Sequence, residues 1–406
     1  MQERERRLSA AQAVRPTIMV LTDYYLPGFR SGGPVQSIQN LVDSLSADFD
    51  FRIATRSHDL GSRSTYPTVI VGTWQPVHAA TVRYLGPREL GFGFRNLLNS
   101  TPYDVLYLNS YFSPRFSIVP LVLRRLHAIQ PKPTVIAPRG EFYPGALRIK
   151  AGKKRAWLLI SRLMGLYRDV IWQASTDEEA RFIASLIGER AKILVAPDLA
   201  QPLTTGEVHD PSYPAPKMPG IARIVFFSRI SPKKNLEFAL SLLSQVSAGR
   251  IEFDIYGPIE DERYWVKCQK LISSLEMSST IDITYQGEVP HDRVKSVLSR
   301  YDLMLFPSRG ENFGHVIYEA LASGCPVAVS DQTPWGEVAS TGAGWVIPLA
   351  SSEQWRRVIE DVVKADEATL KSLRIAAMQL AGTQSSRKET IELSKQLFHV
   401  AARDHE

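Results

Sequence analysis

The chain has 406 residues, which is enough for two or three domains, and its 44% hydrophobic and 22% charged residues indicate a folded globular protein. Two cysteines, Cys268 and Cys325, are too few for a disulfide framework or a four-thiolate zinc site. No stretch of about 18 apolar residues predicts a membrane span, and the charged segment 1–15 does not resemble a secretory signal. We therefore expect a cytoplasmic protein.

Basic residues are concentrated in the front half of the chain. Up to residue 200 there are 26 Lys and Arg against 16 Asp and Glu, whereas the remainder has 22 against 26. Such an excess favours an anionic partner, either nucleic acid, an anionic membrane or a phosphorylated substrate. Because no nucleic-acid-binding motif accompanies the charge, we expect no nucleic acid partner.

The front half alternates short apolar runs with amphipathic stretches. This pattern predicts a mostly parallel sheet that is covered by helices on both faces. The expected strands are 17–23, 51–55, 69–72, 82–85, 104–108, 134–137, 170–173 and 192–195, and the expected helices are 35–45, 116–128, 153–167 and 177–187.

The segment 200–220 interrupts the alternation, because it contains five prolines and has little apolar periodicity. Beyond it the alternation resumes. The expected strands are 223–227, 252–256, 281–285, 303–306, 327–329 and 345–347, and the expected helices are 236–246, 261–275, 292–298, 316–322, 353–363 and, in the tail, 387–402.

Two successive alternating regions predict an α/β protein with two Rossmann-like, doubly wound domains. We expect an N-terminal domain at 1–200, a linker at 201–220 and a C-terminal domain at 221–385. A last helical segment, 386–406, is expected to return to the N-terminal domain. Because ligands of such sheets bind at the carboxyl ends of the strands, we expect a site in a cleft between the two domains.

The first candidate site follows the strand at 223–227. Arg229 and Lys234 lie five residues apart in a turn, and a helix is predicted to begin directly after them. Cations at the carboxyl end of a strand, beside a helix N-terminus, favour an anion, and a diphosphate would fit. The alternative is a solvated loop with two surface cations.

The second candidate site lies between the strands at 303–306 and 327–329. Glu311 precedes a predicted helix that begins near Gly314, and Glu319 lies within that helix. Carboxylates accept hydrogen bonds from paired sugar hydroxyls, and the amides around Phe313 could hold an anion or hydroxyls. The alternative is a favourable acidic residue at a helix N-terminus and an ordinary helical glutamate. Glu319 has small and apolar neighbours, however, and a glutamate in such a place is unfavourable without a polar or charged partner.

Together the two segments resemble the group 1 (family 4) retaining glycosyltransferases. The hallmarks are an Arg–x4–Lys pair that opens the second domain and a Glu–x7–Glu pair about 80 residues on, present here as Arg229/Lys234 and Glu311/Glu319. Further matches are Pro307-Ser308, Phe313-Gly314, Glu319-Ala320 and Gly324-x-Pro326-Val327. The resemblance implies the glycosyltransferase B (GT-B) fold and sugar transfer from a nucleotide-diphosphate sugar with retention at the anomeric carbon.

The resemblance also implies roles for individual residues. Arg229 and Lys234 would hold the donor diphosphate, Glu319 the ribose hydroxyls, and Glu311 the donor sugar near the reacting carbon. Asn312, Phe313 and Gly314 would complete the donor site. In the front domain Gly32 and Gly33 match a glycine-rich loop, in which a missing side chain lets the backbone approach the donor. A plain turn is the alternative for these two glycines.

A further match is the run from Ala137 to Leu147, which contains Arg139 and Glu141. Many relatives have His at the position of Arg139, and an arginine cannot act as a base at neutral pH. We expect Arg139 and Glu141 to bind the acceptor, with an Arg–Glu pair that braces a turn as the alternative.

We expect no metal and no cofactor, because there is no Asp-x-Asp box after a strand and the eight histidines form no ligand cluster. The implied partners are a nucleotide-sugar donor and a glycan or lipid-linked acceptor in bacterial polysaccharide biosynthesis. A basic amphipathic stretch at 150–168 could contact the anionic inner face of the cytoplasmic membrane, or it could pack on its own sheet. The rival functions are a nucleotide-sugar epimerase or phosphorylase on the same fold and a non-catalytic sugar-nucleotide-binding subunit.

Overall fold

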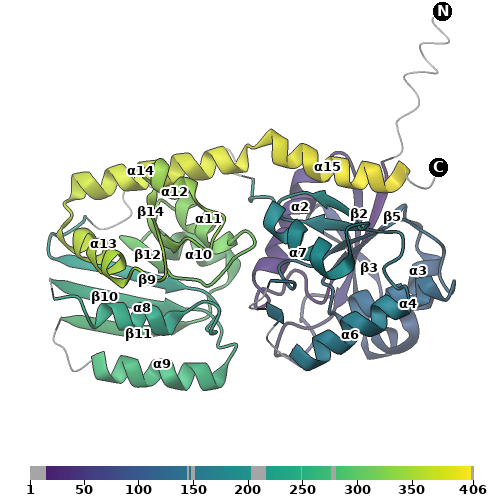
Figure 1. Cartoon of the computed structure of the whole chain (residues 1–406), viewed down its shortest axis with the longest axis horizontal. Coiled ribbons are helices and arrows are strands. Elements are labelled where there is room, and N and C mark those ends of the chain that lie inside the picture. Colours follow the sequence, from purple (N-terminus) through teal and green to yellow (C-terminus); the bar gives the residue numbers. More distant parts are fainter. Residues whose placement is uncertain are drawn as a thin grey trace, which may run out of the picture. The chain divides into compact units, whose positions relative to one another are not determined.

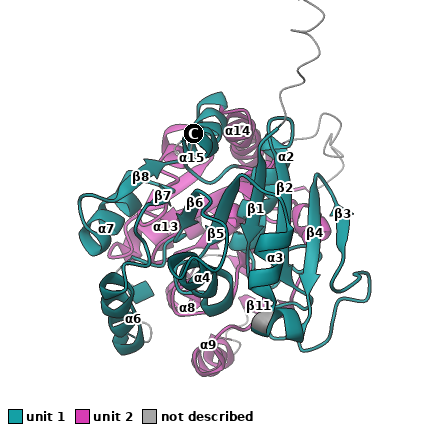
Figure 2. Cartoon of the chain, turned by 90° about the vertical axis from the view of Figure 1, so that its right-hand side faces the viewer, with its two compact units in different colours: residues 1–199, 388–406 teal, residues 200–387 magenta. Residues whose placement is uncertain are grey.

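The computed structural model describes residues 15–143, 146–147, 151–202, 216–247, 249–275 and 280–403. The chain forms two compact units (Figure 2). Unit 1 contains residues 1–199 together with 388–406, and unit 2 contains residues 200–387. Each unit has its own sheet, so each is described separately.

Unit 1 is built on an eight-stranded sheet with the order β3-β4-β2-β1-β5-β6-β7-β8. Only β3 runs antiparallel to its neighbour, and its Pro76 is tolerated because β3 lies at the sheet edge. The strands are β1 (Thr17–Leu21), β2 (Asp50–Arg56), β3 (Trp74–Val77), β4 (Ala80–Leu85), β5 (Val105–Asn109), β6 (Thr134–Ala137), β7 (Val170–Ala174) and β8 (Lys192–Val195).

Helices cover both faces of this sheet (Figures 1 and 2). Side chains of β1 alternate between the faces, as a strand requires: Ile18 and Val20 pack with α2 and α15, and Met19 and Leu21 pack in the opposite cluster. The helices are α2 (Gly33–Leu45), α3 (Phe94–Ser100), α4 (Val119–Arg125), α6 (Ala151–Leu163), α7 (Asp177–Ile187) and α15 (Lys388–Arg403).

The C-terminal helix α15 belongs to unit 1 although it lies nearly 190 residues beyond the rest of that unit. Its Phe398 is fully buried and meets Phe49 edge to face, with the ring centres 5.5 Å apart. The Tyr107 ring makes a second edge-to-face contact at 5.3 Å. Aromatic pairs of this geometry anchor the helix in the unit 1 core.

Unit 2 has a six-stranded, wholly parallel sheet with the order β11-β10-β9-β12-β13-β14. Its strands are short runs of buried, mainly aliphatic residues, which suits a sheet that is covered on both faces. The strands are β9 (Ile221–Phe227), β10 (Arg250–Tyr256), β11 (Ile281–Gly287), β12 (Leu303–Phe306), β13 (Val327–Ser330) and β14 (Gly344–Ile347).

Two helical layers enclose the unit 2 sheet (Figure 1). One core cluster contains residues of α8, α9 and α13, and the other contains residues of α10, α11, α12 and α14. The helices are α8 (Leu236–Leu243), α9 (Glu262–Leu275), α10 (His291–Leu298), α11 (His315–Ala322), α12 (Glu337–Ser340), α13 (Ser352–Lys364) and α14 (Glu367–Ser385).

Each sheet has one point at which the strand order reverses. In unit 1 the neighbours of β1 are β2 on one side and β5 on the other, and in unit 2 the neighbours of β9 are β10 and β12. Loops that leave the carboxyl ends of the two central strands diverge at such a point and leave room for a ligand. The loops after β1 and β5, and those after β9 and β12, are therefore the places to look for a site.

The predicted α/β class with two doubly wound sheets is confirmed, but two predicted elements need correction and a long helix was missed. The strand at 69–72 is wrong: Val71 makes only an isolated bridge to Tyr84, and the actual edge strand is β3. The predicted helix at 116–128 is interrupted, because a π-helical turn at Pro114–Ile118 precedes the shorter α4. The 19-residue α14 was missed, since its apolar residues are mostly small and form no single stripe.

Candidate functional site

Lys234 and Glu311 form a buried ion pair at the switch point of unit 2, which is the place where the strand order of its sheet reverses. Lys234 follows β9 and Glu311 follows β12, which are neighbouring strands. Lys234 Nζ lies 2.7 Å from Glu311 Oε1, and the two side chains are only 11% and 8% exposed. The fold thus brings together the two motifs that the sequence singled out 77 residues apart.

Hydrogen bonds fasten the two loops to each other. The Asn235 side chain donates to the Pro307 carbonyl, and its own carbonyl oxygen accepts from the Arg309 guanidinium at 3.0 and 3.2 Å. The Arg309 amide donates to the Lys233 carbonyl at 2.8 Å. Ser308 Oγ donates to Glu311 Oε1 at 2.5 Å. Because so many groups position the pair, the ammonium of Lys234 is preorganised.

Burial and the ion pair shift the pKa of each member of the pair in opposite directions. Burial lowers the pKa of Lys234, with smaller contributions from Arg229 and Lys233, while Glu311 opposes the shift. Burial would raise the pKa of Glu311, but the ammoniums of Lys234 and Lys233 and the hydrogen bonds outweigh it, so that pKa lies below its usual value. Positive charge is therefore gathered at this loop pair, which favours an anionic ligand.

Arg229 extends this positive region toward solvent. Its Nη1 lies 2.9 Å from Glu260 Oε1, and the two side chains are 30% and 42% exposed. The turn that carries Arg229 packs closely on β10: a Cβ at Gly257 would lie 2.0 Å from the Ser228 carbonyl oxygen, so only glycine fits there. Arg229 is thus held near Lys234 but is free to exchange its carboxylate partner for a ligand.

Arg229→Ala is expected to change the stability of the chain by less than about 1 kcal/mol, because solvent-exposed ion pairs contribute little. The same substitution is expected to weaken nucleoside diphosphate binding about tenfold, since it removes a cation from the anion site. Urea unfolding and calorimetric titration measure the two effects. Arg250→Ala is the matched control, because Arg250 forms an exposed pair with Asp282 at the start of β10. Equal ligand affinity in both variants would contradict the prediction.

Glu319 lies on α11 and is 9% exposed. Its nearest polar contact that the structure gives is His291 Nδ1, which is 3.6 Å from Oε1, too far for a hydrogen bond. Burial raises the pKa of Glu319 to about 8 against a smaller opposing effect of Lys295, and burial lowers the pKa of His291. The contact therefore joins two groups that are mainly neutral at pH 7. A buried carboxyl group of this kind is ready to exchange hydrogen bonds with ligand hydroxyls.

The loop at 312–314 leads from Glu311 into α11. Gly314 caps that helix with a φ of 82°, which a glycine adopts without strain, and Trp335 Nε1 donates to the Phe313 carbonyl at 2.5 Å. The Phe313 ring also meets the Trp335 ring, with the centres 5.4 Å apart. Phe313 and Gly314 are thus held at the N-terminus of α11, and Asn312 lies between them and Glu311.

The glycine loop of unit 1 follows β1 at the other switch point. Gly32 has a φ of 65° and caps α2, and Gly33 is the first residue of that helix. The Asp59 side chain, from the loop after β2, accepts hydrogen bonds from the amides of Phe29 and Arg30 at 3.0 and 3.3 Å. Gly32 and Gly33 are therefore in a fixed turn whose shape depends on a carboxylate from a neighbouring loop.

Arg139 lies just after β6 and is held by three partners inside unit 1. Its guanidinium pairs with Asp198, donates to Asn109 Oδ1 at 3.1 Å and donates to the Tyr107 hydroxyl at 2.8 Å. Its side chain is 9% exposed. These contacts favour a role in bracing the loop, and its predicted contact with an acceptor stays a prediction.

Glu141 is likewise used inside unit 1. Its carboxylate accepts from Ser110 Oγ at 2.7 Å and from the amides of Tyr111 and Phe112 at 2.5 and 3.2 Å. Burial raises the pKa of Glu141 against these hydrogen bonds. The carboxylate thereby fixes the loop after β5. A contact between Glu141 and an acceptor would have to be made in addition to these three hydrogen bonds.

The structure also gives contacts to residues for which the sequence had predicted no role. Asn235 and Ser308 fasten the Lys234 loop, and Glu260 and His291 accompany Arg229 and Glu319. Asn235 lies next to Lys234, and Ser308 is part of the matched Pro307-Ser308 pair, so these two had a signal in the sequence. Within the described residues no cluster of three or more His, Cys, Asp or Glu could hold a metal ion. No helix in the described part of the chain is long and apolar enough to cross a membrane.

The same architecture occurs in solved structures. Sucrose-phosphate synthase from Thermosynechococcus elongatus superimposes with a TM-score of 0.69 over 95% of this chain and 99% of that one, at 16% identity. HepE of Anabaena in complex with UDP-glucose gives 0.65 over 95% and 99%, at 14% identity. WaaG, a glycosyltransferase involved in lipopolysaccharide biosynthesis, gives 0.60 over 95% and 99%, at 13% identity. These likenesses define a two-sheet protein with the GT-B fold.

Residues 216–378 match the family model described as "Glycosyl transferases group 1". This matched segment, which includes Arg229, Lys234, Glu311 and Glu319, is a group 1 glycosyltransferase domain.

Two curated proteins are similar over shorter segments. O-antigen chain mannosyltransferase RfbU of Salmonella typhimurium is 30% identical over 105 residues, which are 26% of this chain and 29% of RfbU. Sulfoquinovosyl transferase SQD2 of Arabidopsis thaliana is 25% identical over 107 residues, which are 26% of this chain and 19% of SQD2. The chain therefore matches less than a third of the length of either relative.

Proposed function

We propose that the chain transfers a sugar from a nucleotide-diphosphate sugar to a glycan or lipid-linked acceptor, with retention at the anomeric carbon. The observation that carries the proposal is the buried, preorganised Lys234–Glu311 pair at the switch point of unit 2, with Arg229 beside it. The matched domain and the names of the relatives agree with this proposal.

The cations would act on the leaving group. When the bond between the anomeric carbon and the diphosphate oxygen breaks, the electron pair stays on the diphosphate, and Arg229 and Lys234 stabilise the added negative charge. Removing one preorganised donor of this kind typically costs about 3–4 kcal/mol of transition-state stabilisation. The acceptor oxygen forms the new bond to the same face of the carbon, and its proton passes to the departing phosphate oxygen.

The other residues would position the donor. Glu319 is buried and lacks a hydrogen-bonded side-chain partner in the described structure, so it can take the two ribose hydroxyls. Glu311 holds Lys234 in place and presents its carboxylate next to the diphosphate site, where it can meet sugar hydroxyls. Asn312, Phe313 and Gly314 offer backbone groups at the start of α11, and Gly32 and Gly33 offer a backbone without side chains. Arg139 and Glu141 shape the loops at which we place the acceptor.

A thermal-shift screen with UDP, GDP and ADP sugars tests donor binding first, because a ligand that binds only the folded state raises the melting temperature. Turnover of the donor that binds, with a panel of acceptors, tests transfer, and the anomeric configuration of the product tests retention. Binding without turnover of any acceptor would instead favour a non-catalytic binding subunit. Inversion of configuration would overturn the retaining mechanism.

The setting that we propose is the assembly of a bacterial surface or secreted polysaccharide at the inner face of the cytoplasmic membrane. Relatives named for O-antigen and lipopolysaccharide synthesis support this setting. Helix α6 supplies a contact surface: Trp157 and Leu158 pack on the unit 1 core, while Leu159, Ile160 and Leu163 are 60%, 46% and 78% exposed. Exposed cations on the same helix would favour anionic lipid.

Charge reversal on α6, Arg155→Glu/Arg162→Glu, is expected to reduce binding to vesicles containing phosphatidylglycerol at least fivefold in a co-sedimentation assay. Each basic residue near an anionic surface contributes about 1 kcal/mol. The control is Arg88→Glu/Arg95→Glu, which reverses two other exposed cations of unit 1. If both variants bind the vesicles as the wild type does, α6 is not the membrane contact.

A further inference from the structure

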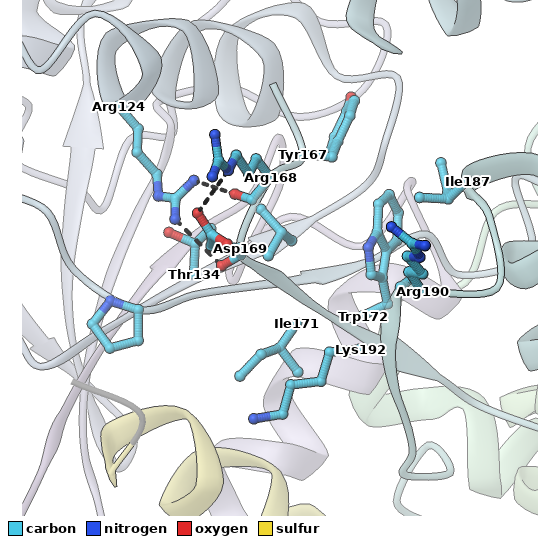
Figure 3. A pocket seen from close by; sticks show the side chains of 13 residues that line it. Arg124, Thr134, Tyr167, Arg168, Asp169, Ile171, Trp172, Ile187, Arg190 and Lys192 are labelled. Carbon is cyan, nitrogen blue, oxygen red and sulfur yellow. Dashed lines mark hydrogen bonds and ion pairs between the residues drawn. The ribbon is translucent and has the colours of Figure 1, made fainter. Parts of the chain in front are cut away.

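Unit 1 contains a cavity at the edge of its sheet where the strands β6, β7 and β8 begin. The cavity has a volume of about 630 Å³ (Figure 3). It is lined by the first residues of three neighbouring parallel strands, Thr134 of β6, Val170 of β7 and Lys192 of β8. The loops of unit 1 that carry Gly32, Gly33, Arg139 and Glu141 leave the carboxyl ends of the strands, whereas the cavity lies where strands begin.

The lining combines cations with apolar side chains. Four cationic side chains reach the cavity, those of Arg124, Arg168, Arg190 and Lys192, against the single carboxylate of Asp169. Tyr167, Ile171, Trp172 and Ile187 also line the cavity, although Ile171 and Trp172 expose little surface to it (Figure 3). Such a composition suits an anionic ligand.

Arg124 organises one wall of the cavity. Its guanidinium donates to the carbonyls of Arg168 and Asp169 at 2.8 and 3.3 Å, and Figure 3 shows these bonds as dashed lines. They hold the turn before β7, in which Asp169 has a φ of 58°. The turn thereby presents the Arg168 side chain, which is 82% exposed and only 3.7 Å from the equally exposed Asp169. A solvent-exposed ion pair of this kind is weak, so the Arg168 guanidinium can exchange Asp169 for a ligand.

Arg190 and Lys192 also line the cavity: Arg190 lies on the turn that leads from α7 into β8, and Lys192 is the first residue of β8. Both side chains are exposed, and the Arg190 side chain has no hydrogen bond or ion pair to another described residue. A guanidinium fork pairs with two phosphate oxygens at once, and an ammonium adds a point charge beside it. Cationic side chains from several elements around one cavity favour an anion with several oxygens.

We propose that this cavity is a second anion site, which binds a phosphate- or diphosphate-bearing ligand. The site accounts for part of the positive charge of the front half of the chain, which the proposed transfer reaction does not use. The ligand can come from two sources, a soluble sugar phosphate or the headgroup of an anionic lipid, because both present the same chemistry.

The test measures binding in a Lys234→Met/Glu311→Gln background, where the proposed donor site has lost its ammonium. Calorimetry with inorganic pyrophosphate and with glucose 6-phosphate probes the soluble source, and vesicles with and without phosphatidylglycerol probe the lipid source. Arg190→Ala/Lys192→Ala is expected to weaken binding of at least one probe tenfold or more. Arg88→Ala/Arg95→Ala, which removes two other exposed cations of unit 1, is the matched control and is expected to change nothing.

Binding of pyrophosphate or the sugar phosphate that depends on Arg190 and Lys192 would assign a soluble ligand. If only the binding of anionic vesicles depends on these two residues, the ligand is a lipid headgroup. Absence of binding by every probe would overturn the proposal, as would equal losses in the two double variants. Because the background already lacks the Lys234 charge, these outcomes do not depend on whether the donor assignment is correct.

Discussion

Lys234→Ala is expected to lower the free energy of unfolding by about 3–5 kcal/mol, because it leaves the Glu311 carboxylate buried without its ion-pair partner. The same change is expected to abolish sugar transfer and to weaken nucleoside diphosphate binding at least a hundredfold. A single substitution therefore mixes two effects, loss of a structural pair and loss of a phosphate contact. Urea unfolding and calorimetry on the same variant measure both.

The double variant Lys234→Met/Glu311→Gln separates the two effects. It removes both charges and keeps the shapes similar, and replacing a whole buried pair by uncharged groups is often close to neutral for stability. We therefore expect near-wild-type unfolding in urea but loss of nucleoside diphosphate binding at the donor site. Nucleoside diphosphate affinity equal to that of the wild type would refute the role of Lys234, whatever the stability of the double variant. A double variant as unstable as Lys234→Ala would refute the energetic account of the pair.

Glu319 is expected to release a proton when a nucleoside diphosphate binds at pH 7. Its pKa in the empty site is about 8, raised by burial, so it is mostly protonated there. Hydrogen bonds from the ribose hydroxyls favour the ionised carboxylate and lower that pKa. Affinity should therefore rise with pH between 7 and about 8 and then level off. Calorimetry in buffers with different ionisation enthalpies counts the protons that are released.

Glu319→Gln is the control for this linkage, because glutamine cannot release a proton and its complex should show no such pH dependence. His291 is neutral throughout this range, since burial lowers its pKa below 6.5, and it does not interfere. Wild-type binding that releases no proton, or a Glu319→Gln variant with unchanged affinity and the same proton count, would remove the ribose role.

The same carboxyl group links stability to pH. A pKa raised from 4.5 to about 8 favours the protonated form in the folded state. The contribution of Glu319 to the free energy of unfolding is therefore complete below about pH 4.5 and is lost as the pH rises through 8. Each pKa unit corresponds to about 1.4 kcal/mol, so the full shift represents on the order of 4–5 kcal/mol. Relative to Glu319→Gln, the unfolding free energy of the wild type should fall between pH 5 and 9.

The sequence predicted best those features that depend on residues close together in the chain. Short apolar runs predicted 13 of the 14 strands that the described residues form, because a strand buried on both faces needs an apolar run wherever it lies. The Arg229/Lys234 and Glu311/Glu319 spacings were visible because each pair lies on one loop or one turn and helix. The edge strand β3 was missed, since Pro76 and a half-exposed face give it no such run.

Long-range pairing was not visible in the sequence. Nothing in the chain order indicated that Lys234 is neutralised by Glu311, that Arg139 is held by Asp198 or that Glu141 fixes the loop after β5. Those contacts depend on which strands become neighbours, and strand order is a property of the assembled sheet. The cavity lined by Arg190 and Lys192 likewise exists only because the starts of β6, β7 and β8 are adjacent.

The sequence by itself therefore determined the α/β class, the two doubly wound regions and the family of the second one, because each rests on residues close together in the chain. The tertiary structure decided which charges are paired, how deeply Glu319 is buried and where the remaining cations gather. Burial and Coulomb energy depend on distances in space, and only the folded sheets bring residues that are 77 or more positions apart to within 3 Å.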